Sequence, residues 1–409
     1  MAALPQQPVV LSFEEARRSV EQHAAQVRPR GTETVDLLTA SGRVLAEPVI
    51  ADRDFPPFRR AMRDGYAVHS ADLAQLPATL DVIAEIKAGA TDMSVEVRVG
   101  QAAAIMTGAP APAGADAVVM VEYTSVSENR VLVTRAVGAG DNIVPAGSEA
   151  RKGQVLLEPG TQLGYSETAA LASVGKTDVV VFSRPAVAIL STGDEVVGIS
   201  ERPGPSQIRN SNSYSLAVQV REAGGEPKLL GIARDEVSSL RTLIAQGLQS
   251  DLLLLTGGVS MGKYDLVEQV LEEFGAEFLF TGAQIQPGKP IVFGRARGKY
   301  FFGLPGNPVS TMVTFELFAK PLLQALEGAS PAPLTFLHAR LKSEIKTKTG
   351  LKRFLPGLLS GEFEQCQVEL ARWHGSGDVA ATARANCYIV IPPDRERIAA
   401  GEWVAVMLR

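Results

Sequence analysis

The sequence predicts a multi-domain α/β protein organised around a doubly wound parallel-sheet domain with glycine-rich anion loops. With 409 residues, the chain is too long for one ordinary hydrophobic core. Apolar strands alternate with helical repeats in the second half, whereas two other stretches contain short strand-like runs without a helical period. Four units are expected: a discontinuous helical N-terminal linker subdomain (8–50 and 151–184), an inserted β module (51–150), the doubly wound domain (185–328) and a small C-terminal β domain (332–409).

The first helix is predicted from its start signal. Ser12 and Glu15 have the spacing of a capping box, in which the serine hydroxyl and the glutamate carboxylate satisfy first-turn amides. The helix is expected to run to about Val27. Further on, glycines punctuate short β-like runs such as residues 116–121, which predicts the inserted module. Residues 163–175 then predict another short helix, ended by glycine.

The alternation of strands and helices is clearest beyond residue 185. Strands are expected at residues 186–190, 228–232 and 252–255, and helices are expected at residues 216–223, 240–248 and 266–274. The unbroken apolar run 252–255 is typical of a central strand that is covered on both faces. After a linker at residues 331–333, the runs 387–391 and 403–407 predict strands of a separate C-terminal domain.

Composition argues against several other classes of protein. The formal net charge is −5, which disfavours a nucleic-acid surface because phosphate neutralisation needs clustered Lys and Arg. No run approaches the roughly 18 apolar residues of a membrane-spanning helix, and the N-terminus does not have the pattern of a signal peptide. The two cysteines form no disulfide framework, and the four histidines show no metal-ligand spacing. A cytoplasmic protein is therefore expected.

Three loops after expected strands carry the signals of a ligand site, because open α/β sheets bind ligands beyond the carboxyl ends of their strands. In the first, residues 256–262, glycines let backbone amides approach an anion, and the following helix start favours negative charge. The second, residues 287–290, presents Lys289 on a stiff turn. The third, residues 304–310, places Asn307 before a proline at a helix start, so that first-turn amides point outward.

The first loop is open to a second interpretation. Residues 257–263 match the Gly-x-x-x-x-Gly-Lys phosphate loop of nucleoside triphosphatases. The next residue is Tyr264, where that motif needs a serine or threonine hydroxyl for magnesium. A nucleoside triphosphatase is therefore disfavoured.

Carboxylates accompany the three loops. Asp194 and Glu195 follow the first strand, Asp235 follows the second, and Asp265 begins the helix after the glycine-rich loop. Asp265 alone is most simply a partner of the helix dipole. Several acids around one anion site would repel the ligand unless a hard cation bridges them. Magnesium, held by carboxylate and phosphate oxygens, resolves this conflict.

Six segments of the chain, in this order, resemble the MoeA family of molybdopterin molybdenumtransferases, which has the architecture of the gephyrin E domain. They are residues 61–68, 105–110, 191–195, 256–265, 287–290 and 304–310. The resemblance covers nearly the whole chain and implies an L-shaped homodimer whose active cleft is shared between subunits. It also implies Mg²⁺, with molybdate and adenylylated molybdopterin as substrates, and AMP and molybdenum cofactor as products.

The resemblance assigns roles by motif position. The catalytic residues would be Asp64, Thr107, Glu195, Asp235 and Asp265. Glu195, Asp235 and Asp265 would also hold the metal. The residues that would bind substrate or phosphate are Thr256, Gly257, Gly258, Ser260, Gly262, Gly288, Lys289, Pro305, Gly306, Asn307, Ser310 and Ser376. Gln286 stands where lysine is frequent in the family, which removes one positive charge near the expected oxyanion site.

The expected activity is magnesium-dependent hydrolysis of adenylylated molybdopterin, coupled to insertion of molybdate into the dithiolene. The resemblance implies small-molecule substrates, an upstream adenylyltransferase and downstream molybdoenzyme chaperones as partners, and neither nucleic acid nor membrane. Two alternatives stay open: a non-catalytic pterin-binding carrier or scaffold, and a molybdopterin adenylyltransferase. The clustered acids disfavour a scaffold, which does not need groups that repel its ligand. The inserted module and the C-terminal domain disfavour the adenylyltransferase, which does not need them.

Overall fold

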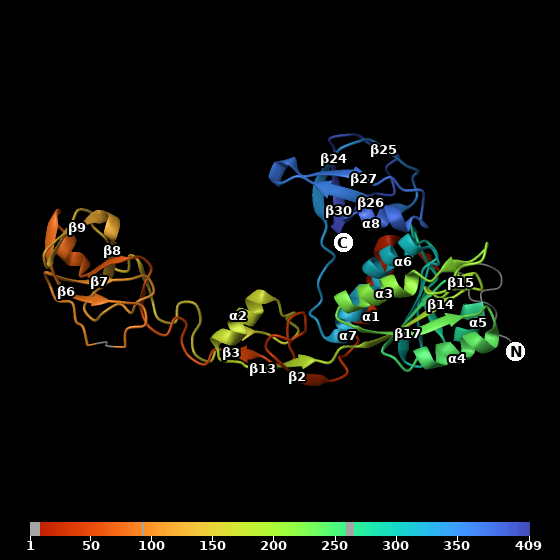
Figure 1. Cartoon of the computed structure of the whole chain (residues 1–409), viewed down its shortest axis with the longest axis horizontal. Coiled ribbons are helices and arrows are strands. Elements are labelled where there is room, and N and C mark those ends of the chain that lie inside the picture. The colour runs from red at the N-terminus through yellow and green to blue at the C-terminus, as the bar shows by residue number, and fades with distance from the viewer. Residues whose placement is uncertain (1–8, 92–93, 259–265) are drawn as a thin grey trace.

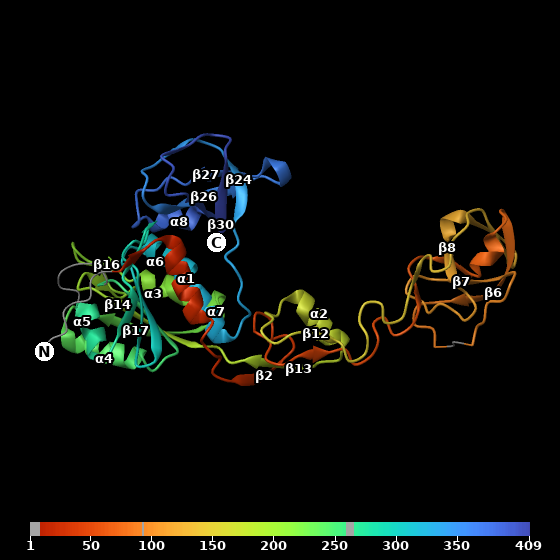
Figure 2. The same ribbon diagram turned by 180° about the vertical axis from the view of Figure 1, so that it is seen from behind.

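The computed structural model describes residues 9–91, 94–258 and 266–409, and it shows an elongated molecule (Figure 1). A small β module forms one end, an α/β domain forms the other, and a narrow subdomain with helix α2 (Tyr165–Ser173) lies between them. The C-terminal β domain stacks against the α/β domain near α6 (Pro308–Thr314) and α8 (Val379–Arg384). The view from behind shows the same separation of the β module from the other units (Figure 2).

A six-stranded sheet forms the centre of the α/β domain. Its spatial order is β17 (Glu226–Ala233), β14 (Ala186–Thr192), β18 (Leu252–Thr256), β23 (Lys299–Leu304), β22 (Val292–Ala296) and β19 (Glu277–Phe280). The first four strands pair in parallel, as predicted. β22 and β19 extend this sheet in antiparallel pairing. Arg297 and Gly298, both with positive φ, make the two-residue turn between β22 and β23, which is too short for a parallel crossover.

Helices cover both faces of this sheet, so that the domain is doubly wound. Val187 and Ile189 of β14 face α3 (Asn212–Glu222), whereas Ala188 and Leu190 face the opposite side. The helices on the first side are α1 (Phe13–Ala24), α3, α6 and α7 (Lys320–Glu327), and those on the second side are α4 (Val237–Gly247) and α5 (Leu266–Glu273). Because successive side chains of a strand alternate between the faces, the apolar strands fill both cores.

The N-terminal helix begins with the predicted capping box. Ser12 Oγ accepts a hydrogen bond from the amide of Glu15, and the Glu15 carboxylate accepts one from the amide of Ser12 at 2.9 Å. The helix ends at Ala24, before the predicted Val27, because the amides of Gln26 and Val27 bond to carbonyls only three residues earlier. Within the described residues, no helix is both long and apolar enough to cross a membrane.

The segments before and after the β module pair with each other. β2 (Thr32–Asp36) pairs antiparallel with β13 (Asp178–Phe182), and β3 (Val49–Ile50) pairs antiparallel with β12 (Val155–Leu157). The module itself contains a sheet in the order β8 (Ala117–Met120), β5 (Gly65–Val68), β7 (Gln101–Ile105), β6 (Ala78–Ile86), β10 (Arg130–Val133) and β9 (Thr124–Ser127). The chain therefore enters and leaves the module through the same narrow subdomain.

The C-terminal domain is a small closed sheet. Its strands follow the order β26 (Lys352–Ser360), β27 (Gln367–Leu370), β24 (Leu337–Leu341), β30 (Trp403–Leu408) and β28 (Cys387–Ile391), and β28 pairs again with β26. The short strand β21 (Ile285–Gln286), which follows the α/β sheet in sequence, adds to β26 in parallel. This pairing fixes the C-terminal domain beside the loop that carries Lys289.

A buried carboxyl group lies where α7 ends against the narrow subdomain. Glu327 is 1 % exposed, and its Oε1 has no hydrogen-bond partner in the part of the chain that the structure describes. A side chain at Gly224 would clash with this carboxyl group, since a Cβ there would lie 1.9 Å from Oε2. Burial raises the pKa of Glu327 to about 7, although Arg184 and Arg43 lower it in part.

Glu327→Gln should stabilise the protein at pH 8 and have little effect at pH 5. The raised pKa means that the folded state prefers the protonated acid, so this stability is complete below about pH 4.5 and is lost as the pH rises through about 7. Glutamine cannot ionise, and the gain at pH 8 should be on the order of 3 kcal/mol. Thermal denaturation at both pH values measures this, and an equal effect at the two values would contradict it.

Candidate functional site

Loops at one edge of the α/β sheet surround a cavity at the point where the strand order reverses. β14 lies between β17 and β18, so the loops after β14 and β18 diverge and leave a crevice. A cavity of about 430 Å³ occupies this position. Its wall is formed by Ser191, Thr192, Glu195, Val196, Ile208–Asn212, Thr256–Gly258, Pro290 and Pro305–Pro308. Thr256, Gly257, Gly258, Pro305, Gly306 and Asn307 were all expected to bind substrate, and all lie together here.

Two glycines give the loop after β18 its shape. Gly257 has φ +89° and Gly258 has φ +60°, which is left-handed backbone that residues with a Cβ rarely adopt. A Cβ on Gly257 would lie 2.4 Å from the carbonyl oxygen of Thr192, and one on Gly258 would lie 2.6 Å from Thr192 Oγ1. Gly257 and Gly258 therefore pack directly on β14, and their backbone faces the cavity without intervening side chains.

Two side-chain oxygens in the wall of this cavity are buried without a partner among the described residues. Thr192 is 1 % exposed, and no described residue makes a hydrogen bond with its Oγ1. Asn212 Nδ2 donates to Thr256 Oγ1 at 2.9 Å and to the carbonyl oxygen of Gly306 at 2.8 Å, whereas its Oδ1 accepts nothing. Buried polar atoms are rarely left unpaired in folded proteins. These two oxygens therefore fit a polar ligand in the cavity.

A second cavity, of about 590 Å³, adjoins the first. It shares Pro290, Pro305 and Asn307 with the first cavity. The remaining residues of its wall are Ile285–Lys289, Ser310, Leu351, Trp373, Gly375 and Ser376. It therefore brings together Gly288, Lys289, Ser310 and Ser376, four of the expected substrate-binding residues, from both the α/β domain and the C-terminal domain.

Asn307 differs from its expected role as a capping side chain. It occupies the N-cap position of α6, and Pro308 is the first helical residue, but its side chain makes no capping bond. Asn307 Nδ2 instead donates to Ser376 Oγ at 2.8 Å, and the amide of Val309 donates to the Ser376 carbonyl oxygen at 3.0 Å. The start of α6 therefore forms hydrogen bonds to the C-terminal domain, and the Asn307 side chain does not cap the helix.

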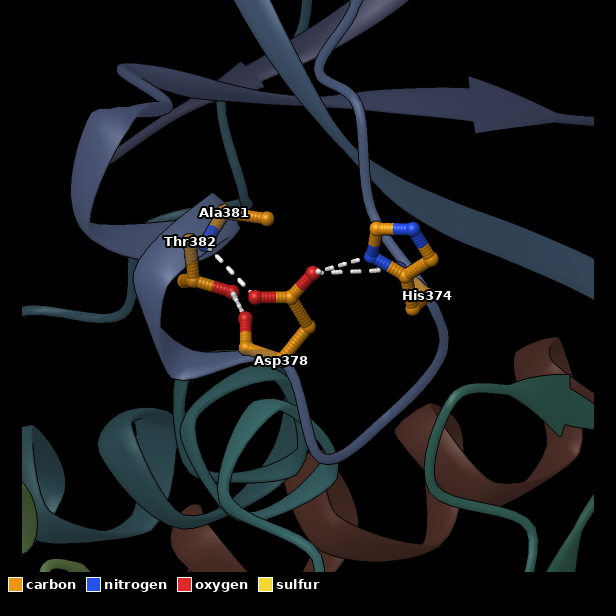
Figure 3. Close-up of polar contacts among 4 residues, drawn as sticks. All are labelled: His374, Asp378, Ala381 and Thr382. Atoms are coloured by element: carbon orange, nitrogen blue, oxygen red, sulfur yellow. Dashed lines mark hydrogen bonds and ion pairs between the residues drawn. The ribbon is translucent and has the colours of Figure 1, made fainter.

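The loop that carries Ser376 is closed by a carboxylate (Figure 3). Asp378 begins α8 and accepts hydrogen bonds from the amide of Ala381 at 2.9 Å and from the amide of His374 at 3.0 Å. These bonds, with the contact to the His374 ring at 3.3 Å, lower the pKa of Asp378. The carboxylate is therefore ionised at neutral pH and ties both sides of the loop.

Arg353, which lies beside the second cavity, is the residue that the sequence interpretation missed. It is the register partner of Gln286 in the β21–β26 ladder, and Gln286 lines the cavity. Arg353 is 7 % exposed, and its Nη1 donates to the Leu351 carbonyl oxygen at 3.0 Å. No carboxylate of the described residues pairs with it or with the exposed Lys289. The only feature of the sequence that pointed to Arg353 was its place in the adjacent basic pair Lys352–Arg353.

The acids expected to hold a metal are only partly placed by the structure. Glu195 lines the first cavity, and the Asp235 amide donates to Asp194 Oδ1 at 3.3 Å. Burial, and then the charges of Asp194 and Glu195, raise the pKa of Asp235. In residues 9–91, 94–258 and 266–409 no group of three acids, histidines or cysteines is placed to hold a metal ion. Asp265 lies outside the described residues, as do Ser260 and Gly262.

Asp64 and Thr107 form a unit on the β module. Asp64 Oδ1 accepts hydrogen bonds from the Thr107 amide at 2.6 Å and from Thr107 Oγ1 at 2.9 Å. These bonds lower the pKa of Asp64, the amide bond most strongly. Gly65 and Ile105 are register partners in β5 and β7, which explains the contact between two residues far apart in sequence. Both residues belong to the β module, which within one chain lies at the opposite end of the molecule from the α/β domain, whose residues line both cavities (Figure 1).

Three family models match the chain in succession. They are the MoeA N-terminal region (domain I and II) over residues 11–175, a probable molybdopterin binding domain over residues 188–325, and the MoeA C-terminal region (domain IV) over residues 338–408. The second of these regions contains β14, β18 and the loops that form the first cavity.

Individual proteins agree with these models. The chain is 36 % identical to the molybdopterin molybdenumtransferase of Nostoc sp. over 92 % of this chain and 88 % of that protein. It is 35 % identical to the one from Bacillus subtilis, over 92 % and 90 %. The solved structure of the molybdopterin biosynthesis protein MoeA from Pyrococcus horikoshii OT3 aligns with a TM-score of 0.79 and 31 % identity, over 98 % of this chain and 100 % of that chain. The chain therefore belongs to the MoeA family.

Proposed function

We propose that this protein is a molybdopterin molybdenumtransferase, which hydrolyses adenylylated molybdopterin and inserts molybdate into the dithiolene, giving AMP and molybdenum cofactor. The observation that carries the proposal is the pair of adjoining cavities. Within the described residues, one has a glycine-lined wall with unpaired buried oxygens, and the other is lined by Lys289, a cation without an acidic partner. A phosphate-bearing pterin and an oxyanion need these two environments side by side. The names of the relatives support the same assignment.

The first cavity would hold the phosphate end of the pterin substrate. The backbone of Gly257 and Gly258 is exposed to the cavity because neither residue has a side chain. The Thr192 hydroxyl lies against both glycines and can donate to a phosphate oxygen. Asn212 Oδ1 can only accept, so it would face an N–H or O–H group of the ligand, away from the phosphate.

The second cavity would hold molybdate. Lys289 in its wall supplies a point charge. Arg353, the ladder partner of the wall residue Gln286, would supply a guanidinium, of which Nη1 donates to the Leu351 carbonyl oxygen. The hydroxyls of Ser310 and Ser376 line the same wall and can donate to oxyanion oxygens. In the proposed reaction, dithiolene sulfurs replace oxygens of molybdate. The two cavities share Pro290 and Pro305, so both substrates would lie in one cleft.

Magnesium fits this cleft on the chemistry of its donors. Asp235 feels the charges of Asp194 and Glu195, and a cluster of hard oxygen ligands with like charges favours a divalent cation. We assign Glu195, Asp235 and Asp265 as its ligands. When bound, the ion would neutralise and polarise the phosphate groups that link AMP to the pterin. An upstream adenylyltransferase and downstream molybdoenzyme chaperones are the proposed protein partners.

We further propose that the protein acts as a homodimer in which the β module of one subunit completes the cleft of the other. Asp64 and Thr107 form an ordered polar unit with a charged carboxylate, yet one chain holds them far from both cavities (Figure 2). A twofold arrangement of elongated chains can bring a module to the cleft of its partner. The proposed function of Asp64 and Thr107 therefore requires two chains.

Mixing two variants that are each nearly inactive at low molybdate concentration should restore activity at that concentration. Asp64→Asn and Arg353→Met alter residues from different units, so each homodimer should have two defective clefts. After subunit exchange, activity should recover to about one quarter of wild type, because about half of the dimers are mixed and each has one intact cleft of two. Turnover after co-refolding measures the recovery. Two variants that stay inactive when mixed, although mixed dimers form, would contradict a shared cleft.

Release of AMP tests the function directly. We expect the protein to release AMP from adenylylated molybdopterin in the presence of magnesium and molybdate, and to consume no ATP. A pterin carrier or scaffold would bind the same compound without releasing AMP. A molybdopterin adenylyltransferase would consume ATP instead. Separating nucleotides by chromatography after incubation with each substrate distinguishes the three functions, and either of the last two results would overturn the proposal.

A further inference from the structure

The loop at residues 374–378 delivers Ser376 to the second cavity, and its backbone has little to hold its shape. Gly375 has φ +115°, and a Cβ on Gly375 or Gly377 would have no neighbour within 4 Å. Two glycines in open space allow many conformations. A specific means of restraint is therefore needed if Ser376 is to keep its place beside Asn307.

The Asp378 carboxylate supplies that restraint by bridging the two sides of the loop (Figure 3). One oxygen, Oδ1, accepts from the Ala381 amide and caps α8. The other, Oδ2, accepts from the amide of His374, at the far side of the loop. A backbone bond of 3.0 Å from the Asp378 amide to the Gly375 carbonyl oxygen tightens the turn further. Only an acid presents two oxygens that can serve both sides at once.

Ser376 then fastens the closed loop to the α/β domain, and among the described residues it is the only loop residue that does so through hydrogen bonds to the start of α6. Ser376 accepts from Asn307 Nδ2 through its hydroxyl oxygen and from the Val309 amide through its carbonyl oxygen. Trp373, which precedes the loop, packs partly buried against the cores of both domains and lines the cavity. The wall of the second cavity between Trp373 and Ser376 is therefore shaped by the loop that Asp378 closes.

We propose that Asp378 is a positioning residue, which holds the 374–378 loop closed and thereby sets Ser376 and Trp373 in the wall of the oxyanion cavity. Asp378 does not line either cavity, so it acts through the loop and not on the substrate. The inference rests on the proposed function, since it assigns molybdate to this cavity. It predicts that affinity for molybdate depends on the second oxygen of Asp378, separately from the stability of α8.

Asp378→Ser is the discriminating variant. Serine is a good N-cap and can keep the bond from the Ala381 amide, but its single short hydroxyl cannot also reach the His374 amide. Melting temperature should therefore stay close to wild type. Affinity for molybdate, measured by calorimetry on the full-length protein with molybdate alone, should fall about 5- to 10-fold. Asp378→Asn, which keeps only one acceptor oxygen, should show a similar loss and serves as a second test.

A spectroscopic signal reports the loop itself. The chain has two tryptophans, so a Trp403→Phe background leaves Trp373 as the only tryptophan, which is excited selectively at wavelengths that tyrosine does not absorb. In that background, Asp378→Ser should make Trp373 more accessible to acrylamide quenching. His374→Ala is the matched control: it removes the ring, which is 93 % exposed, but keeps the backbone amide that Asp378 holds. It should bind molybdate as wild type does.

The outcomes separate the two proposals. Wild type that binds no molybdate would overturn the proposed function and this inference together. Wild type that binds, with Asp378→Ser binding equally well, would overturn the inference alone. The inference would also fail if His374→Ala lost affinity as much as Asp378→Ser, because the ring and not the tether would then be responsible. Lower affinity in Asp378→Ser and Asp378→Asn, with quenching increased and melting unchanged, supports it.

Discussion

Arg353→Met should make the protein at least as stable as wild type and should weaken its use of molybdate about 10- to 100-fold. Arg353 is 7 % exposed and has no carboxylate partner in the described part of the chain, and burial lowers its pKa. A buried charge without a partner destabilises a fold, so an apolar side chain of similar length is tolerated or favourable. The same charge should stabilise a bound oxyanion through charge-assisted hydrogen bonds.

The measurement is the dependence of turnover on molybdate concentration, together with thermal denaturation. Arg395→Met is the control, since Arg395 lies in the same domain but is paired with Glu402 at 2.7 Å, and it has no ladder partner in the wall of the second cavity, as Arg353 has in Gln286. It should leave the molybdate dependence unchanged. A marked loss of stability in Arg353→Met would instead make Arg353 a structural residue of the barrel, and an unchanged molybdate dependence would remove it from the oxyanion site.

Gly257→Ala should abolish binding in the first cavity, whereas Gly275→Ala should be nearly harmless. Both glycines have positive φ, +89° and +71°, so alanine introduces comparable backbone strain of about 1–2 kcal/mol at each. They differ in their surroundings. A Cβ at Gly275 would meet nothing within 4 Å, but one at Gly257 would lie 2.4 Å from a backbone oxygen of Thr192. A strand carbonyl cannot move aside, so the loop must shift away from β14.

Calorimetry with AMP as the probe compares the two variants. Affinity should fall more than about 100-fold for Gly257→Ala, since a shifted loop loses several backbone contacts at once. Gly275→Ala should bind AMP as wild type does and melt slightly earlier. If both variants bound AMP equally well, the backbone at Gly257 would have no part in recognising the nucleotide.

The sequence predicted the α/β domain well because its signals are local. Apolar runs such as residues 252–255, and helix starts such as Ser12 with Glu15, depend on neighbours along the chain. The loops that were expected to meet do meet, because the carboxyl ends of parallel strands share one edge of a sheet. The antiparallel strands at the other edge follow from a two-residue turn at Arg297, which no apolar pattern reveals.

The parts of the site that the sequence did not predict depend on contacts between units. Arg353 joins the second cavity only because β21 adds to β26 in a register that pairs it with Gln286. In the sequence, Asn307 has the position of an ordinary helix cap. Only the docked C-terminal loop gives its side-chain amide a different partner, Ser376. Periodicity and capping rules describe one element at a time, so they cannot identify either contact. The metal ligands stay a prediction, because Asp265 lies outside the described residues.

The elongated shape of the chain has a consequence for how catalysis would scale with abundance. Because Asp64 and the two cavities lie at opposite ends of one chain, an isolated chain would bind nucleotide but could not complete a cleft. If the cleft is shared as proposed, the rate of cofactor synthesis would follow the concentration of dimers. Because dimers dissociate at low protein concentration, this rate would fall more steeply than the protein concentration itself. A cell would then have a threshold of protein abundance below which pterin is bound but not converted.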